Sequence, residues 1–598
     1  MKNYLRILLL SSALPGFALF GVCTKASAAT LSVSPAVTSN TYAGVITLSI
    51  TGLTNGEQVE IQKYLDLNSN GIVDLGEPLT DAFRISDGGV ALIGGITNLN
   101  IPFDSNPAAG AVTTTLNFLP ALVTDTFAAS SIYRLVSPTG RFTPVTTTFV
   151  VTNAAFTQFL SGTVYSNGLS PFPNAVVVAQ DQQANNPAAG SVTDSAGHYS
   201  LALRPGSYSL IALAQNYYFD QSFAPSINLT NGMSATNDLF LTNGTVSISG
   251  SVYDAATSNK LGGVLMQLQS GNLFAITFSD ANGDYSAAVT PAFWKIQPTK
   301  ERLARRGYVV PQAKLQVDTT TGSVANVGLA LPAGNALFYG RLNDNSNTPL
   351  PNVEIDSGTD DNSYGAKGYS DANGNYAVAV LGDGTNRWSC GVNNGRDPVL
   401  GSYIFNSFEN TNVTPNLTVL QNFVALPATA RISGSVHDNS GNPVTGVTLI
   451  SSATIGSNRY QSLDSSTDNS GNYSLEVASG FWQVEFLNGG SSDNLDSHGF
   501  ADLSGPHFVS IPPTNAVLNL TVYPIGTPAI SGPHRFSATQ FGFTVTGATN
   551  VNYTVETSTN LTSANWTTLF SFLMTTNPFT IMDPYATNKT RFYRVKKD

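Results

Sequence analysis

The chain contains little cysteine and little charge. Cys23 and Cys390 are its only two cysteines among 598 residues, and charged residues make up 11% of it, against about 25% in an average soluble domain. Because Cys23 falls in an N-terminal segment that we predict is removed, the mature monomer has no internal disulfide. Each domain must therefore hold its core without a crosslink. We predict that Cys390 is a buried, inert thiol, with an intermolecular disulfide as the alternative.

Several classes of function lack their usual signals. The net charge is −11, which disfavours nucleic acid and anionic lipid as partners. After the N-terminal segment no run reaches the ~18 uninterrupted apolar residues of a membrane helix, so we expect no membrane insertion. There is no His-Glu-x-x-His, no Gly-x-Ser-x-Gly and no phosphate-binding glycine loop, and we predict that the protein is not an enzyme. The five histidines show no metal-binding spacing: His198, His437, His498, His507 and His534.

The N-terminus has the pattern of a signal peptide. Lys2 and Arg6 precede an apolar stretch over residues 7–22, and Ala26-Ser27-Ala28 is a small-residue cleavage site. We predict that residues 1–29 are this segment, with cleavage near residues 28–29. The mature protein is then secreted, either extracellular or at the cell surface.

A turn motif, Asp-x-x-Gly-x-Tyr, occurs four times. It begins at Asp194, Asp280, Asp371 and Asp468, and recurrence at about 90 residues indicates tandem copies of one β-domain. Asp can accept hydrogen bonds from its own backbone two residues on, and Gly takes the positive φ of a tight reversal. The Tyr then begins a strand, where aromatic residues are favoured.

Each copy also opens with a strand that contains a glycine: Gly162, Gly250, Gly340 and Gly434. The Ser-Gly-x-Val opening followed by the Asp-x-x-Gly-x-Tyr turn resembles the carboxypeptidase regulatory-like domain, a transthyretin-like β-sandwich of the carbohydrate-binding-like fold group. The resemblance covers residues 156–525 and is weakest in the third copy, which lacks the Ser before Gly340. It implies spacer, adhesive or binding modules, because such domains without a catalytic unit have no activity of their own; the fold by itself assigns no function.

The last segment contains Asn565-Trp566 and strand-like runs. It resembles the fibronectin-III-like C-terminal β-module of exported proteins of the Verrucomicrobia type. We therefore predict an all-β chain, a linear array of about six Ig-like or transthyretin-like β-sandwich modules after the signal peptide. The predicted modules are an N-terminal domain (30–152), repeat 1 (156–244), repeat 2 (245–334), repeat 3 (335–428), repeat 4 (429–525) and a C-terminal module (526–598).

Residues 66–77 have the twelve-residue spacing of an EF-hand calcium loop. Side-chain oxygens stand at positions one, three, five, nine and twelve, and Gly71 at position six permits the sharp bend. Pro78 and the alternating run at 59–62 indicate flanking strands, so we predict a calcium loop placed within a β-domain, with a polar turn as the alternative. The predicted calcium ligands are Asp66, Asn68, Asn70, Ile72 (through its carbonyl), Asp74 and Glu77.

Two further groups of residues have alternative interpretations. Tyr208, Trp294 and Trp482 follow their repeat turns at similar distances; they could stack on a polysaccharide, but recurrence at one position favours a core role. The basic stretch at 300–306 is predicted to form a short, solvated helical insertion, with a partner site as the alternative.

Together these features predict an exported, calcium-stiffened, rod-like adhesive, scaffolding or binding protein. Its partners would be an extracellular polysaccharide or a cell-surface protein, and we expect a monomer. One alternative is a carbohydrate-binding protein; the other is an accessory subunit of an exported hydrolase.

Overall fold

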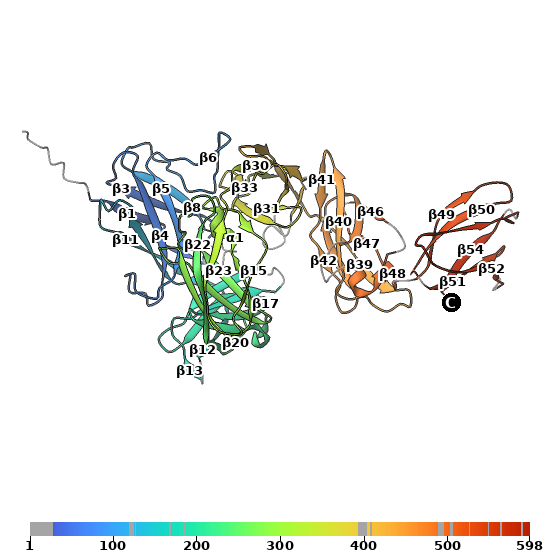
Figure 1. Ribbon diagram of the computed structural model, residues 1–598, viewed down its shortest axis with the longest axis horizontal. Helices are drawn as coiled ribbons and strands as arrows, with labels where there is room; N and C mark the ends of the chain where they lie inside the picture. The colour runs from blue at the N-terminus through green and yellow to red at the C-terminus, as the bar shows by residue number, and fades with distance from the viewer. Residues whose placement is uncertain are drawn as a thin grey trace, which may run out of the picture.

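The computed structural model describes residues 28–597, apart from 119–124, 126, 167–168, 183–185, 393–402, 407–409, 488–494, 503–505, 513, 525–526, 548, 550, 562–564 and 588–589. The predicted signal peptide lies outside the described residues, except for its last two positions. The described chain is almost entirely strand, which confirms the all-β prediction of tandem β-sandwich modules (Figure 1). In this part of the chain no helix is both long and apolar enough to cross a membrane.

The N-terminal domain packs a three-stranded sheet, β1-β3-β8, against a five-stranded sheet, β2-β11-β10-β4-β5. Its core holds alternate residues of these strands, such as Leu48, Ile50 and Phe149. The domain contains β1 (Thr30–Ser34), β2 (Val37–Ser39), β3 (Val45–Thr51), β4 (Gln58–Asp66), β5 (Leu79–Ser86), β6 (Leu92–Ile93), β7 (Ile96–Thr97), β8 (Val112–Asn117), β9 (Phe127–Ala128), β10 (Ser130–Val136) and β11 (Val145–Thr152).

Repeats 1 and 2 share one arrangement of strands. Repeat 1 contains β12 (Gln158–Ser166), β13 (Ser170–Pro171), β14 (Val176–Asp181), β15 (Asn186–Val192), β16 (His198–Leu203), β17 (Gly206–Leu213), β18 (Tyr217–Asp220), η1 (Gln221–Phe223), β19 (Ser226–Leu229), β20 (Ser234–Thr236) and β21 (Leu239–Asn243). Repeat 2 contains β22 (Val246–Asp254), β23 (Leu265–Ser270), β24 (Leu273–Phe278), β25 (Asp284–Val289), β26 (Phe293–Pro298), α1 (Lys300–Ala304), β27 (Val310–Pro311), β28 (Leu315–Asp318) and β29 (Val324–Leu331).

Repeats 3 and 4 follow the same order. Repeat 3 contains β30 (Ala336–Asp344), β31 (Glu354–Thr359), β32 (Tyr364–Tyr369), β33 (Asn375–Val380), β34 (Arg387–Val392), β35 (Tyr403–Asn406), β36 (Thr411–Asn412), β37 (Thr418–Leu420) and β38 (Phe423–Pro427). Repeat 4 contains β39 (Ala430–Asp438), β40 (Thr448–Ile455), β41 (Asn458–Gln461), β42 (Ser465–Ser466), β43 (Asn472–Val477), β44 (Gly480–Phe486), η3 (Asp496–His498), β45 (Phe500–Ala501), β46 (His507–Ile511), β47 (Ala516–Val517) and β48 (Leu520–Pro524).

The C-terminal module is a separate sandwich of two three-stranded sheets, β49-β50-β53 and β52-β51-β54. Val545, Tyr553 and Val555 are buried between them. Its strands are β49 (Ala529–Arg535), β50 (Phe541–Thr546), β51 (Asn552–Ser558), β52 (Thr567–Leu573), β53 (Phe579–Asp583) and β54 (Phe592–Lys597).

In every repeat the opening glycine and the tyrosine of the turn motif face the same backbone carbonyl. In repeat 4, Oδ1 of Asp468 accepts from the backbone N–H of Ser470 and of Asn472, each at 2.8 Å, and the hydroxyl of Tyr473 donates to the carbonyl of Leu518 at 2.7 Å. A Cβ at the opening glycine would lie only 1.8–1.9 Å from the carbonyl oxygen that this tyrosine binds in its repeat. The glycine is therefore required because a neighbouring backbone passes where a side chain would stand.

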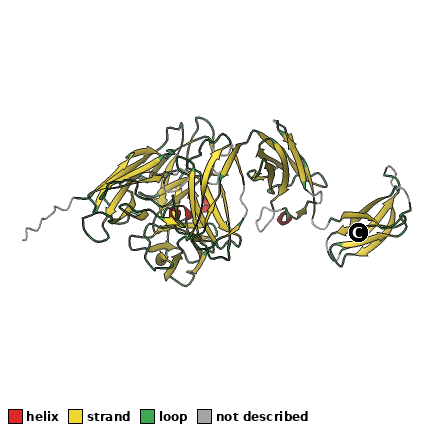
Figure 2. Ribbon diagram, turned by 90° about the horizontal axis from the view of Figure 1, so that it is seen from above, coloured by secondary structure: helices red, strands yellow, loops and turns green. Residues whose placement is uncertain are grey.

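The first four modules gather into one body, and the last two extend from it. In Figure 1 the N-terminal domain and repeats 1–3 lie together, while repeat 4 and then the C-terminal module continue to the right. The view from above gives the same arrangement (Figure 2). The modules are in tandem as predicted, but the four-domain body (residues 30–427) departs from a straight rod because the N-terminal domain packs against three repeats.

Candidate functional site

The predicted calcium loop joins β4 to β5 at one end of the N-terminal domain. Asp66 ends β4 and is buried; its two carboxylate oxygens accept from the backbone N–H groups of Asn70 (3.1 Å) and Gly71 (3.0 Å). Gly71 has a φ of 75°, the left-handed conformation that its position in the loop requires. The strands on both sides confirm that the loop is part of a β-domain.

The remaining predicted ligands are linked to one another. Oδ2 of Asp74 accepts from the amide nitrogens of Asn68 (2.8 Å) and Asn70 (2.6 Å), and these bonds lower the pKa of Asp74. The two oxygens of Glu77 accept from the backbone N–H groups of Leu67 and Asp74, at 3.1 and 3.0 Å. Ile72 lies with its side chain in solvent, and its N–H donates to Oδ1 of Asn70 at 2.7 Å.

The donor set fits a hard cation. Carboxylate, amide and backbone oxygens are the ligands that Ca²⁺ takes in proteins. The pKa of Glu77 is raised, first by its partial burial and then by the carboxylates of Asp66 and Asp74, a repulsion that a divalent cation would relieve. Within the described residues, however, no three His, Cys, Asp or Glu side chains are grouped as metal ligands, and each carboxylate of the loop accepts from N–H donors.

Helix α1 of repeat 2 lies inside the four-domain body, where it is drawn in red in Figure 2. Arg302 binds Asp125 at 2.6 Å and Asp81 at 3.3 Å, and Arg305 binds Asp81 at 2.9 Å. Lys63 lies 3.5 Å from Asp125. The helix predicted at 300–306 is present, but the prediction that it is solvated is wrong, because Arg302 fills a buried position between two modules.

We call Lys63, Asp81, Asp125, Arg302 and Arg305 the buried ion cluster. Burial lowers the pKa of Lys63 to about 8. Burial would raise the pKa of Asp125, but Arg302 and Lys63 overcome this and lower it to about 2. Three basic groups thus face two carboxylates, so removal of one positive charge would leave the cluster balanced.

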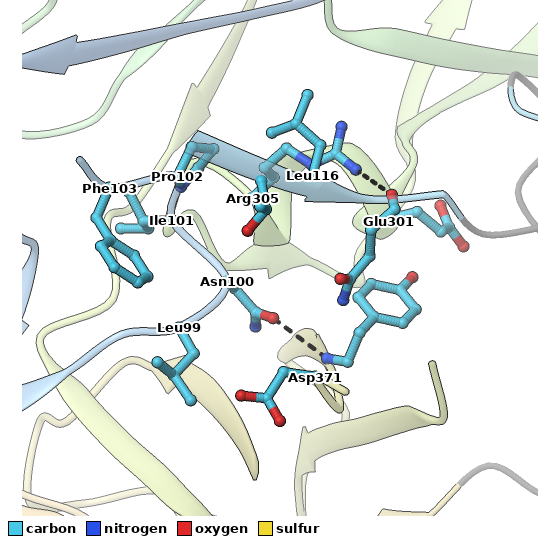
Figure 3. A pocket seen from close by; sticks show the side chains of 12 residues that line it. Leu99, Asn100, Ile101, Pro102, Phe103, Leu116, Glu301, Arg305 and Asp371 are labelled. Atoms are coloured by element: carbon cyan, nitrogen blue, oxygen red, sulfur yellow. Dashed lines mark hydrogen bonds between the residues drawn. The ribbon is translucent and has the colours of Figure 1, made fainter. Parts of the chain in front are cut away.

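A cavity of about 130 Å³ lies beside this cluster, where the N-terminal domain meets repeats 2 and 3. Asn100 reaches it from the N-terminal domain, and Glu301 and Arg305 reach it from repeat 2 (Figure 3). Oδ1 of Asn100 accepts from the backbone N–H of Tyr369 at 3.2 Å, and Lys367 of repeat 3 binds Glu301 at 3.2 Å. The cavity's polar groups therefore connect the three modules.

The hairpin β6–β7 of the N-terminal domain covers the outer face of repeat 3. Ile93 and Ile96 pack on Leu337, Ala377 and Ala379. In repeat 4 the positions of Leu337 and Ala379 are taken by Arg431 and Glu476, paired across the same two strands. Apolar residues at these outward positions are a sequence signal for the covered repeat, and the predictions from the repeat motif did not include it.

Neighbouring repeats are joined by strand pairing. The strands β18, β27 and β35, which we call the junction strands, pair with β24, β32 and β41 of the following repeat. A residue with positive φ precedes two of them, Asn216 (φ 68°) and Gly307 (φ 73°). The recurring Asn/Gly-Tyr-x-apolar sequence at 216–219 and 307–310 could have revealed these strands.

The last junction differs from the others. Tyr403 of repeat 3 corresponds to Phe500 of repeat 4, so Asp502 takes the place of Phe405. The carboxylate of Asp502 binds Nε2 of His507 at 2.8 Å. Among the described residues no strand of the C-terminal module pairs with repeat 4. Within the described ranges the series of sheet-joined repeats therefore ends at repeat 4, where the pairing position carries a charge.

The recurrent aromatic residues are core residues. Tyr208, Trp294 and Trp482 are buried, as is Trp388 of repeat 3; each indole N–H donates to a carbonyl of its own repeat at 2.8–2.9 Å. This supports the core interpretation and excludes these rings as a sugar-stacking surface. Cys390 is buried, as predicted, and burial raises the pKa of its thiol to about 12, which makes it unreactive.

Comparison with known proteins places only part of the chain. No curated protein matches it. Among solved structures it is similar to the Bacillus anthracis TIE protein (13% identity, 66% of this chain and 74% of that one, TM-score 0.16) and to a streptococcal ancillary pilin (10%, 46% and 98%, 0.15). The Bacillus cereus major pilin subunit BcpA gives 10% identity over 61% and 99%, with a TM-score of 0.14. With TM-scores this low, the similarity carries no information about how the modules of this chain are arranged. Residues 160–242, which form most of repeat 1, match the carboxypeptidase regulatory-like domain family.

Proposed function

We propose that this protein is an exported, non-catalytic scaffold whose joined β-sandwiches hold their ends at a fixed separation outside the cell. The observation that carries the proposal is the main-chain pairing at the three junctions between repeats. Flexible linkers let domains rotate, whereas hydrogen bonds between strands fix both distance and orientation. A chain built in this way suits a spacer or an adhesive stalk better than a set of independent modules.

Small-angle scattering of the mature chain tests the rigidity. We expect a compact body with a fixed extension formed by repeat 4, and a C-terminal module that moves more freely. The variant Phe405→Asp copies the residue of the last junction and should free repeat 4, which would increase the radius of gyration. Its control, Asp502→Ala, should leave that radius unchanged. Free rotation of repeats 1–4 in the unaltered protein would refute the scaffold.

Calcium binding at residues 66–77 would stiffen the scaffold. Six oxygen donors in EF-hand order support this, and we expect a dissociation constant of roughly 10⁻⁴ to 10⁻³ M, the range of extracellular modules. Titration with Ca²⁺ should raise the melting temperature of the N-terminal domain. The double variant Asp66→Ala, Glu77→Ala should abolish the rise. If millimolar Ca²⁺ has no effect on the unaltered chain, the loop is a polar turn.

Polysaccharide binding is a second candidate, supported by one exposed feature of repeat 4. Phe481 on β44 and Phe508 on β46 are 61% and 52% exposed, with ring centroids 5.3 Å apart and planes within 4°. Aromatic rings of this kind can stack on sugars, and Gln483 lies beside them on the same face. Retention on an insoluble glycan, lost in Phe481→Ser and kept in Phe293→Ser, would support it. No binding across a broad glycan panel would exclude it.

A further inference from the structure

The calcium loop closes at the same place where the N-terminal domain contacts repeat 1. The backbone N–H of Leu65 donates to the carbonyl of Pro78 at 3.0 Å where β4 and β5 enter the loop. One residue into the loop, Leu67 donates its N–H to Oε1 of Glu77. Leu65 belongs to the hydrophobic core of repeat 1, and Leu67 packs against it. The last ligand of the loop therefore fixes the backbone of a residue that contacts another module.

The strand that leaves the loop contacts repeat 2. Leu79 begins β5, and its Cδ2 lies 3.1 Å from where a Cβ would stand at Gly262 of repeat 2. Two residues later, Asp81 binds both Arg302 and Arg305. Lys63, on β4, is the register partner of Asp81. The two strands that the loop connects thus carry the contacts to repeat 1 and the buried ion cluster.

The carboxylates of the loop repel one another, and this repulsion favours a cation in its closed form. Residues 66–77 contain three carboxylates, Asp66, Asp74 and Glu77, and no basic side chain. Their mutual repulsion opposes the approach of Glu77 to the start of the loop. A divalent cation bound between the carboxylates would attract all three and would therefore favour that approach. Release of Glu77 would free the backbone of Leu67, which packs on repeat 1.

We propose that calcium bound at residues 66–77 fastens the N-terminal domain to repeats 1 and 2, so that calcium controls the compactness of the four-domain body. This inference rests on the calcium binding of the proposed function. Thermodynamic linkage makes the coupling reciprocal: if calcium favours the docked domains, docking must tighten calcium binding by the same factor.

Hydrogen exchange of the full mature chain, with and without 2 mM Ca²⁺ (about twice the upper end of the expected range), tests the docking. We expect calcium to slow exchange at three places: the loop, β9 and β15, which pair between the N-terminal domain and repeat 1, and residues 300–306. The double variant Asp66→Asn, Glu77→Gln should lose all three effects. Asp468→Asn, the same chemical change in a repeat-4 turn, should keep them.

Two failures are distinguishable when the exchange experiment is combined with a calorimetric titration of calcium. If calorimetry finds no calcium binding, both the calcium part of the proposed function and this inference fall. If calcium binds and protects the loop but leaves β9, β15 and residues 300–306 unchanged, the site stands and the coupling is refuted.

The reciprocal measurement is the calcium affinity of chains whose docking is weakened away from the loop. Arg302→Ala should raise the calcium dissociation constant about fivefold or more, in the usual range of coupling between sites. Phe127→Ala, which weakens the contact with repeat 1, should do the same and serves if Arg302→Ala does not fold. Phe481→Ala in repeat 4 is the control. An unchanged affinity in a folded chain whose interface exchanges rapidly would overturn the proposal.

Discussion

Repeats 3 and 4 place the same strand positions in different surroundings. Their inner constellations agree: Gly340 and Gly434 face crossing carbonyls, and Tyr376 and Tyr473 bind them. Their outer faces differ, because repeat 3 is covered by the hairpin of the N-terminal domain and repeat 4 faces solvent. The motif therefore specifies the sandwich, while the outward residues specify whether a repeat is free or packed within a larger body.

The largest expected loss of stability comes from exchanging the outward residues of repeats 3 and 4. Leu337→Arg places a charge against Ile93 and Ile96 and should destabilise repeat 3 by about 3–5 kcal/mol or undock the hairpin. The reverse change, Arg431→Leu, should alter repeat 4 by less than about 0.5 kcal/mol, since the site is exposed. Fluorine-labelled tryptophan reports both, because Trp388 and Trp482 lie in different repeats. If the two substitutions change stability equally, the outer faces of repeats 3 and 4 do not differ in packing, and the comparison fails.

Replacement of the opening glycine should reduce stability by the same amount in both repeats. Gly340→Ala and Gly434→Ala each force a Cβ to within 2 Å of a carbonyl oxygen and should cost about 2–3 kcal/mol in denaturant unfolding followed by the same tryptophans. Gly391→Ala, with no atom within 4 Å of its Cβ, is the control. A clearly larger cost in one repeat would show that the inner constellations are not equivalent.

A pH titration separates the four-domain body from repeat 4. The pKa of Lys63 is about 8 when folded and about 10.5 when unfolded, so between these values the unfolded state binds more protons and stability rises with pH. Relative to Lys63→Met, the unaltered body should gain on the order of 1–3 kcal/mol from pH 8 to 10, because the buried tyrosines, whose pKa values are raised by burial, contribute equally to both chains. Lys63→Met should lose this gain and keep the body folded at pH 7, because two arginines still face two aspartates. An equal gain in the stability of repeat 4 would show that Lys63 is not the source of the pH dependence.

The smallest expected effect concerns the ion pair on the exposed face. Arg431 binds Glu476 at 2.6 Å, yet solvent screens such pairs, and Arg431→Ala should cost no more than about 0.5 kcal/mol. Salt up to 0.5 M should remove what remains (the Debye length is then only a few Å, roughly 4 Å). A cost above 2 kcal/mol in thermal unfolding would mean that this face is packed against another surface.

Much of the fold was predictable because its signals are local. Asp468, Gly471 and Tyr473 interact with their own turn or with the crossing strand of their own repeat, so a short motif was enough to locate each sandwich. The loop at residues 66–77 was found in the same way, since its hydrogen bonds stay mostly within twelve residues. Calcium there stays a prediction.

The contacts between modules were not predictable by the same means. Arg302 looked like a solvated charge because its partners, Asp81 and Asp125, lie far away in the sequence. The junction strands were missed because two residues of pairing leave almost no periodicity. Leu337 and Ala379 did differ from their counterparts in repeat 4, but only the structure identifies the hairpin that covers them.

The amino-acid sequence was sufficient for the all-β class, the four repeats, their turns and the candidate calcium loop. The folded chain was needed to show that four modules form one body, that a basic helix is buried, and that the array of paired sheets ends at Asp502. The physical reason is range: turns and glycine contacts act within one repeat, whereas buried charges and strand edges depend on what another part of the chain brings to them.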